Sequence, residues 1–390
     1  MPFLLPAALG LASMAAAALV PASSVQERTL ECVIKPKVFI ISLFAPEAAV
    51  WYGIPEFDLL AMNVTVPGFS AQFPDAHCTA DGEICQLTTS MGEINSALTV
   101  GSLMHSSRFD LSQTYFLTAG IAGINPEVAT IGSVTFARYA IQVALQHEFD
   151  IRDLPGNYST GYIPIGSTSP TEYPQSIYGT EVFEISQPLQ KLAANFARSA
   201  SLNDSSQAVS YRANYVSELY AAARQTPAVF ECDVATSDVY YSGRLLGEAF
   251  DNYTSLVTNG TGVYCTTAQE DNAVLEALLR AAGSKIVDFA RVIVMRTGSN
   301  FDRPSIGGSA TTNLFYAEQG GFAPAVENIY RAGIKVIEGI LDGWNSTFAQ
   351  GVNATNYIGD IYGTLGGKPD FGPYSNGGGP QESADIYARR

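Results

Sequence analysis

Short apolar, β-rich runs alternate with helix-like segments along this chain, and no other feature of the sequence limits the fold as strongly. Residues 37–44, 83–92 and 289–304 have the length and the composition of buried strands. Residues 269–283 and 322–344 instead carry apolar side chains at helical spacing. Strands that alternate with helices are typical of α/β proteins. We therefore expect an α/β three-layer sandwich with a central sheet that is mainly parallel or mixed.

Two segments depart from this regular alternation. Residues 113–125, QTYFLTAGIAGIN, predict a strand that ends in a turn at Gly120 and Gly123, where another group approaches the bare backbone. Residues 152–180 are rich in Pro, Gly, Ser and Tyr, which predicts a long loop or a lid.

The N-terminus is predicted to be a signal peptide. Its Ala- and Leu-rich stretch has no charged side chain before Glu27, and VPA stands before Ser23 as a small-residue cleavage site. We therefore assign residues 1–22 to a leader, with an uncleaved N-terminal anchor as the alternative. At the other end, residues 360–390 are rich in Gly and Pro and predict a disordered tail. After the leader, no apolar run approaches the roughly 18 residues that a membrane span needs, which excludes a polytopic membrane protein.

Asn-x-Ser/Thr sequons agree with export. They begin at Asn63, Asn157, Asn203, Asn252, Asn259, Asn345 and Asn353. Seven sequons indicate an N-glycosylated protein of the secretory route, with the medium, the cell wall and the vacuole as open destinations.

Five cysteines fit an oxidising compartment. Cys78–Cys85 is the pairing that closes the shortest loop. Cys232–Cys265 is a second candidate, which would leave Cys32 unpaired. Sequence alone does not fix the connectivity.

The composition excludes several classes of ligand. A formal net charge of −16 disfavours nucleic acid and anionic membranes, because both repel an acidic surface. The three histidines show no metal-ligand spacing and no Cys-x-x-Cys accompanies them, so we expect no metal site. A G-x-G-x-x-G after the first strand and a P-loop are both missing, so we expect no dinucleotide, no nucleoside triphosphate and no other cofactor.

Acidic and amide side chains gather where the predicted strands end. Glu47, Glu270 and Asp302 fall at such ends, and the amides Asn272 and Asn300 lie beside them. In α/β sheets the site lies at strand ends, so these groups are expected to face one cleft. Carboxylates and amides without a metal suit a carbohydrate or a nucleoside, because cleavage of a glycosidic bond passes through a cation-like sugar. Taken singly, each acid is more often a helix cap or a solvated charge.

Ordered segments over about residues 33–345 resemble the fungal purine nucleoside permease family, which implies a single domain there. This family is similar to the nucleoside phosphorylase fold, and especially to 5′-methylthioadenosine/S-adenosylhomocysteine nucleosidases. KVFIISLFAPEAAVW resembles their first strand, TTSMGEINSALTVGSLM their second strand, turn and helix, and TAGIAGIN their NTGSAGG turn. SDVYYSG resembles their base-contacting segment, TAQEDNAVLEALLRAAG their VEMEA helix, and VIVMRTGSNFDRP their strand ending in RAISD.

The resemblance implies a role for each matched position. Glu47 would activate a water molecule, and Glu270 would hold the ribose hydroxyls. Asn300 stands where the nucleosidases have the aspartate that protonates purine N7, and Asp302 is the alternative acid. The other matched positions are expected to contact ribose, phosphate or base: Met91, Gly120, Ile121, Gly123, Tyr240, Tyr241, Gln269 and Asn272.

The sequence departs from the phosphorylases where they bind phosphate. The turn serine of GSAGG is Ile121, and FAPEA lacks the glycine–arginine loop. A phosphate dianion needs fixed cations or several amide donors, so we favour water over phosphate as the acceptor.

Two functions follow for a purine nucleoside partner. The first is an enzyme that hydrolyses, or with phosphate phosphorolyses, the N-glycosidic bond for nucleoside salvage. The alternative is a non-catalytic binder that captures nucleosides for uptake, as the family's transport label implies. A structural role in the cell wall and a homodimeric state stay open.

Overall fold

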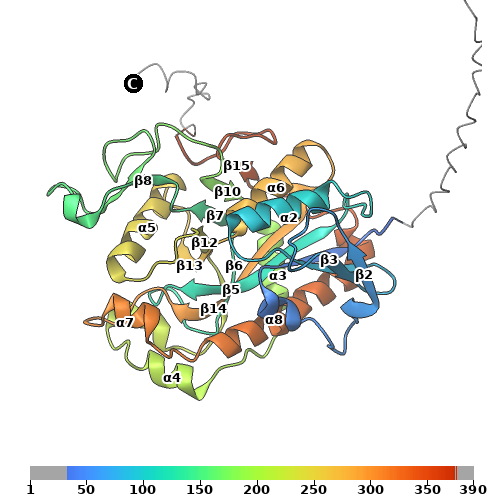
Figure 1. Ribbon diagram of the computed structural model, residues 1–390, viewed down its shortest axis with the longest axis horizontal. Coiled ribbons are helices and arrows are strands. Elements are labelled where there is room, and N and C mark those ends of the chain that lie inside the picture. The colour runs from blue at the N-terminus through green and yellow to red at the C-terminus, as the bar shows by residue number, and fades with distance from the viewer. Residues whose placement is uncertain (1–32, 374, 376–390) are drawn as a thin grey trace, which may run out of the picture. The chain divides into compact units, whose positions relative to one another are not determined.

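The computed structural model describes residues 33–373 and 375. The predicted leader, residues 1–22, and most of the predicted tail lie outside the described residues. Within the described part, helices surround a large mixed sheet (Figure 1).

The strands that the structure describes are β1 (Val38–Ser42), β2 (Met62–Thr65), β3 (Asp75–Cys78), β4 (Ile84–Thr88), β5 (Tyr115–Ile124), β6 (Val134–Phe136), β7 (Tyr139–Gln142), β8 (Gln146–Glu148), β9 (Tyr162–Pro164), β10 (Val182–Glu184), β11 (Val229–Glu231), β12 (Asp233–Thr236), β13 (Tyr264–Ala268), β14 (Val292–Phe301) and β15 (Gly359–Asp360). The α-helices are α1 (Ala45–Ala49), α2 (Glu93–Met104), α3 (Gln187–Ala197), α4 (Ser206–Arg212), α5 (Arg244–Val257), α6 (Asp271–Gly283), α7 (Ala310–Phe315) and α8 (Phe322–Asp342).

The main sheet has 13 strands and branches at β5. Its centre is parallel, since β1 pairs with β4 and β5, and β5 pairs with β14. The same β5 also pairs antiparallel with β13, and β10 pairs antiparallel with β7 and β15. The sheet is therefore mixed, and β5 and β14 are its long strands, with 10 residues each.

Helices cover two faces of this sheet. Phe39 and Ile41 of β1 join an apolar cluster with residues of α2 and α6, whereas Val38 and Ile40 join another with residues of α3 and α8. Successive strand side chains point to opposite faces, so these two helix pairs lie on opposite sides (Figure 1). This arrangement confirms the expected α/β three-layer sandwich. Every residue of β1 is buried, as a strand between two helical layers requires.

The glycines of QTYFLTAGIAGIN do not form a turn, and that expectation was wrong. Gly120 and Gly123 lie inside β5, which continues to Ile124. Across the ladder, Gly120 pairs with Arg296 of β14 and Gly123 pairs with Asn300. Glycine inside a strand marks a place where another group approaches the backbone, which is the case here.

Other expectations can be compared with the described residues. Residues 152–180 are largely irregular, apart from β9. The structure contains the disulfides Cys78–Cys85 and Cys232–Cys265. Part of the predicted tail is packed, because Ile361 and Phe371 are fully buried beside α5. Among the helices of the described part, none is both long and apolar enough for a membrane span.

Candidate active site

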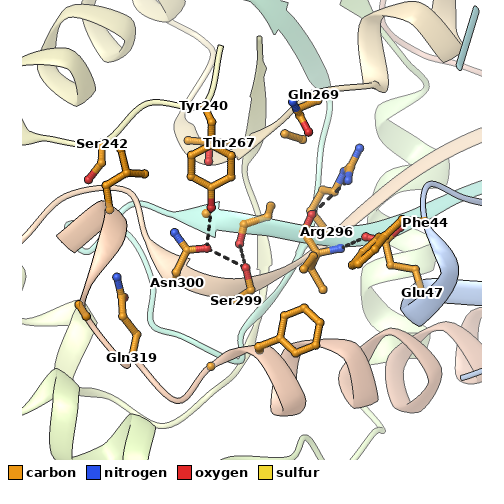
Figure 2. Close-up of a pocket in the computed structure, with 18 of the residues that line it drawn as sticks. Phe44, Glu47, Tyr240, Ser242, Thr267, Gln269, Arg296, Ser299, Asn300 and Gln319 are labelled. Carbon is orange, nitrogen blue, oxygen red and sulfur yellow. Dashed lines mark hydrogen bonds between the residues drawn. The ribbon is translucent and has the colours of Figure 1, made fainter. Parts of the chain in front are cut away.

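A cavity of about 650 Å³ lies where β1, β5, β13 and β14 end. Its walls include Leu43, Phe44 and Glu47 from the β1–α1 junction, Ile121, Ala122 and Gly123 from β5, Thr267 and Ala268 from β13, Gln269 and Glu270 before α6, Arg296, Ser299 and Asn300 from β14, Tyr240 and Ser242 from the loop after β12, Met91 before α2, and Asn313, Leu314 and residues 317–323. In Figure 2, Phe44, Glu47 and Arg296 lie at one end, and Asn300, Ser242 and Gln319 lie toward the other. The sheet thus brings together side chains that are distant in sequence.

Glu47 is held rigidly at one end of the cavity. The β1–α1 junction presents it, and only 1% of the residue is exposed. The Leu43 N–H donates to Oε2 at 2.8 Å, and the Ile121 N–H donates to Oε1 at 2.7 Å. Burial raises the pKa of Glu47 to about 8, although Arg296 and the two amide donors oppose the shift. The carboxyl therefore holds a proton through neutral pH and becomes a base just above it.

Gly120 explains how Glu47 and Arg296 can meet. A Cβ at this position would lie 2.6 Å from Glu47 Oε1 and 2.7 Å from Arg296 Nη1. The bare backbone of β5 thus leaves room for a carboxyl group and a guanidinium group. This is the close approach that the sequence pattern indicated, made by two protein side chains.

Glu270 contributes a second carboxyl group to the cavity wall. It is 4% exposed and precedes α6. The Gly92 N–H donates to Oε1 at 3.1 Å, and Arg296 Nη2 donates to Oε2 at 3.2 Å. Each carboxylate oxygen has two lone pairs, so both keep acceptor capacity for the hydroxyl groups of a ligand.

The far end of the cavity offers an amide and an aromatic ring. Asn300 Oδ1 accepts hydrogen bonds from Ser299 Oγ at 2.8 Å and from the Tyr240 hydroxyl at 3.4 Å (Figure 2). Asn300 Nδ2 makes only a 3.3 Å bond to the Phe301 carbonyl, so it can serve an acceptor on a ligand. Gly123 keeps this end open, because a Cβ there would overlap Thr267 Oγ1.

Eight of the twelve residues expected from the sequence line the cavity: Glu47, Met91, Ile121, Gly123, Tyr240, Gln269, Glu270 and Asn300. Gly120 lies beneath the wall, under Glu47 and Arg296. Asn272 is buried and fastens α6, since it accepts from Thr236 Oγ1 at 2.7 Å and donates to the Thr180 carbonyl at 2.7 Å.

Asp302 and Tyr241 do not line the cavity. Asp302 is 2% exposed and accepts from Arg303 Nε at 2.9 Å and from the Tyr264 hydroxyl at 2.6 Å. The Tyr241 hydroxyl lies 3.2 Å from that of Tyr264. Asp302 is therefore the partner of Arg303 rather than a group facing a ligand, and the network supports the loop that carries Tyr240.

The sequence analysis gave no role to Arg296 or Phe44, and it missed the wall between β14 and α8. Arg296 had a signal, because a single basic residue inside the apolar run VIVMRTGS requires a buried partner. Gln319 had none. It holds its segment in place by accepting from the Phe301 N–H at 2.7 Å, a contact that only the fold creates.

The structural comparison gives a partial likeness to nucleosidases. The 5′-methylthioadenosine/S-adenosylhomocysteine nucleosidase of Neisseria meningitidis, solved with methylthio-immucillin-A, is 13% identical, with a TM-score of 0.46 over 77% of this chain and 98% of that one. The Streptococcus pneumoniae nucleosidase, solved with a transition-state inhibitor, is 16% identical, with a TM-score of 0.47 over 79% and 100%.

Sequence comparison gives a closer relationship. Residues 35–353 match the family described as purine nucleoside permease. The purine nucleoside permease of Candida albicans is 42% identical over 346 residues, which are 87% of this chain and 84% of the relative. A probable purine nucleoside permease of Schizosaccharomyces pombe is 40% identical over 321 residues, 80% of this chain and 91% of the relative. The chain belongs to the purine nucleoside permease family.

Proposed function

We propose that this cavity binds a purine nucleoside and hydrolyses its N-glycosidic bond. The observation that carries the proposal is that Glu47, Glu270 and Asn300, distant in sequence, line one cavity. The names of the family and of its relatives support a purine nucleoside as the ligand.

Glu270 is the group proposed to act on the sugar. Its carboxylate would accept hydrogen bonds from the ribose hydroxyls while Gly92 and Arg296 hold it in place. As the bond between C1′ and N9 breaks, positive charge develops on the ribose ring. A buried carboxylate beside that ring stabilises the cation most strongly at the transition state, which is the condition for a faster reaction.

Glu47 and Asn300 would act on the two other partners of the reaction. An ionised Glu47 takes a proton from water, and the resulting hydroxide oxygen bonds to C1′. The electron pair of the C1′–N9 bond leaves with the purine. Asn300 Nδ2 donates a hydrogen bond to the departing base, which then takes its proton from solvent, while Tyr240 offers a ring for the base to stack on.

The test is base release by the purified full chain. Inosine, adenosine and guanosine are incubated with the protein in phosphate-free buffer, and free base is measured by chromatography. We expect free base to appear and Glu270→Ala to slow its release about 100-fold or more, because a preorganised charge at the transition state is lost. The matched control is Glu276→Gln, which removes a carboxylate of the same helix that pairs with Arg280. Wild-type turnover that Glu270→Ala leaves unchanged would contradict the assignment.

A second candidate function is a nucleoside binder that releases no base and serves uptake. Asn300 favours it, because an amide donates a hydrogen bond but gives no proton to a leaving group. The relatives' names also point to transport. Calorimetric binding of a nucleoside, with no free base after prolonged incubation at pH 8 to 9, would select the binder over the enzyme.

A further inference from the structure

The charges around Arg296 differ from those expected of a site that binds phosphorylated compounds. Among the cavity-lining residues that the structure describes, Arg296 is the only basic side chain. It is 2% exposed. Its Nη1 donates to the Ile121 carbonyl at 3.1 Å, and its Nη2 donates to Glu270 at 3.2 Å. A cation meant for phosphate would instead turn its donors toward the open cavity.

Asp271 takes two further donors of this arginine. Arg296 Nη2 donates to Asp271 Oδ2 at 2.8 Å, and Arg296 Nε donates to Oδ1 at 3.3 Å. Asp271 is completely buried and lies outside the cavity wall, so it does not meet a ligand. As the first residue of α6 it also stands where a helix favours a negative charge.

One guanidinium therefore faces two adjacent carboxylates. Two carboxylates against one guanidinium give the group of three a net negative formal charge, and Glu318 adds another carboxylate at the cavity wall. In a buried site such a charge is weakly screened, so it repels a phosphate oxygen and attracts a cationic sugar.

We infer that Asp271 is a positioning residue that makes the cavity selective for uncharged nucleosides over phosphate and nucleoside phosphates. Asp271 occupies two donors of Arg296 and cancels its charge, and Glu270 is left to serve the ligand. The inference rests on the proposed nucleoside ligand and deepens it by naming the excluded class.

One feature of the cavity favours an anionic ligand instead. The N-terminus of α8 contributes Gly321, Phe322 and Ala323 to the wall, and no side chain caps it. Its free N–H groups carry a partial positive charge of about half an electron, which is smaller than the surplus charge of the Glu270–Asp271 pair.

The test compares ligand affinities by calorimetry for the full chain and for Asp271→Asn. The probes are inosine, inosine 5′-monophosphate and inorganic phosphate. For the wild-type chain we expect inosine to bind at least about 10-fold more tightly than the monophosphate, a difference of one ionic contact. In Asp271→Asn this ratio should fall about 10-fold, and binding of phosphate should appear. A purely structural role for Asp271 would weaken all ligands alike and leave the ratio unchanged.

The matched control is Asp288→Asn, which removes the same charge from the partner of another buried arginine, Arg291, outside the cavity wall. We expect it to leave the affinity ratio as in the wild type. If Asp271→Asn does not fold, the wild-type ratio decides, and equal affinity for inosine and its monophosphate overturns the inference. If the wild-type chain binds inosine but Asp271→Asn leaves the ratio of the two affinities unchanged, the inference is overturned and the proposed function is not. A wild-type chain that binds no nucleoside overturns the proposed function together with it.

Discussion

Gly120 is the residue at which a missing side chain matters most to the cavity. An added methyl group would press on Glu47 Oε1 and Arg296 Nη1, both of which are buried and hydrogen-bonded. Neither group can move away without losing its hydrogen bonds, so the added methyl group would distort the cavity wall. We expect Gly120→Ala to lower the free energy of unfolding by about 1–3 kcal/mol, as overpacking does, and to abolish nucleoside binding. Urea denaturation and calorimetry measure the two effects.

Gly101 provides the control for that substitution. It lies inside α2, and a Cβ there would meet no atom within 4 Å. Gly101→Ala should therefore raise the free energy of unfolding by roughly 0.5–1 kcal/mol, the helix preference of alanine over glycine, and leave binding unchanged. A Gly120→Ala chain that is as stable and as competent in binding as the wild type would contradict the role given to Gly120.

Glu47 predicts how the rate of base release depends on pH. Burial raises its pKa to about 8, and a general base acts only when ionised. Base release should therefore increase about 10-fold per pH unit below that value and level off above it. Initial rates between pH 5.5 and 9.5 test this. In Glu47→Gln the residual rate should be low and should lose this rise. A wild-type profile that is flat over the range would rule out Glu47 as the base.

At the residue scale, the sequence predicted which positions lie near the cavity better than it predicted which side chains line it. Glu47, Glu270 and Asn300 come from well-patterned segments, and all three line the cavity. Tyr240 and Tyr241 are neighbours, and the pattern could not tell that only Tyr240 would line it. Asp302 was a candidate acid because it follows Asn300 by two residues, but the adjacent Arg303 forms an ion pair with it. Such a choice depends on three-dimensional contacts.

The two disulfides act at the scale of elements, and they should differ in effect. Cys232–Cys265 joins residues 33 apart, whereas Cys78–Cys85 joins residues 7 apart. Because a longer loop gains more freedom in the unfolded chain, the Cys232→Ser/Cys265→Ser chain should lose about 4 kcal/mol of unfolding free energy. The Cys78→Ser/Cys85→Ser chain should lose about 2–3 kcal/mol. Guanidinium unfolding of both variants measures the order, and a larger loss for the short loop would contradict it.

The regular elements were predictable where the pattern was strong and the neighbours were local. β1, α2, α6, β14 and α8 all lie within the segments that their patterns indicated. The wall between β14 and α8 was not predictable, because α7 has only 6 residues and its place depends on distant partners. Asn313, for example, accepts from the Tyr211 hydroxyl at 2.9 Å and donates to Ser242 Oγ at 2.9 Å. No periodicity in sequence records such contacts.

At the scale of the whole molecule, the alternation of strands and helices predicted the layers but not the branching of the sheet. The sheet branches at β5 because this strand has three partners. These partners lie far apart in sequence, so no local pattern predicts how they are ordered around β5. Packing of Ile361 and Phe371 against α5 is likewise a long-range contact, hidden by a Gly-rich composition. Export and glycosylation stay predictions. Two of the sequon asparagines have an Nδ2 that already donates a hydrogen bond, Asn203 to Glu327 and Asn259 to the Asp370 carbonyl, so both are poorly suited to carry a glycan.

Several buried carboxyl groups together predict how the stability of the whole domain depends on pH. Burial raises the pKa of Glu47 to about 8, of Glu93 and Glu184 to about 7, and of Asp233 to about 6. Their pKa values in the unfolded chain are near 4. Between these limits the folded chain binds protons that the unfolded chain releases, so unfolding becomes easier as pH rises. The melting temperature should therefore be higher at pH 5 than at pH 8, which calorimetric scans at fixed ionic strength can measure.

The same linkage gives this prediction its control. Asp81 and Asp110 have lowered pKa values, because side-chain hydrogen bonds from Thr79 and Ser112 favour their ionised forms. Their contribution to the stability of the folded chain is lost only as the pH falls through those lowered pKa values. It therefore limits stability at acidic pH, whereas between pH 5 and 8 the groups with raised pKa values determine how stability changes. Glu47→Gln removes the group with the widest window and should flatten the decline up to about pH 8. A melting temperature that rises from pH 5 to pH 8 would mean that these carboxyl groups are ionised in the folded chain, and it would also remove the basis for the pH-rate profile expected of Glu47.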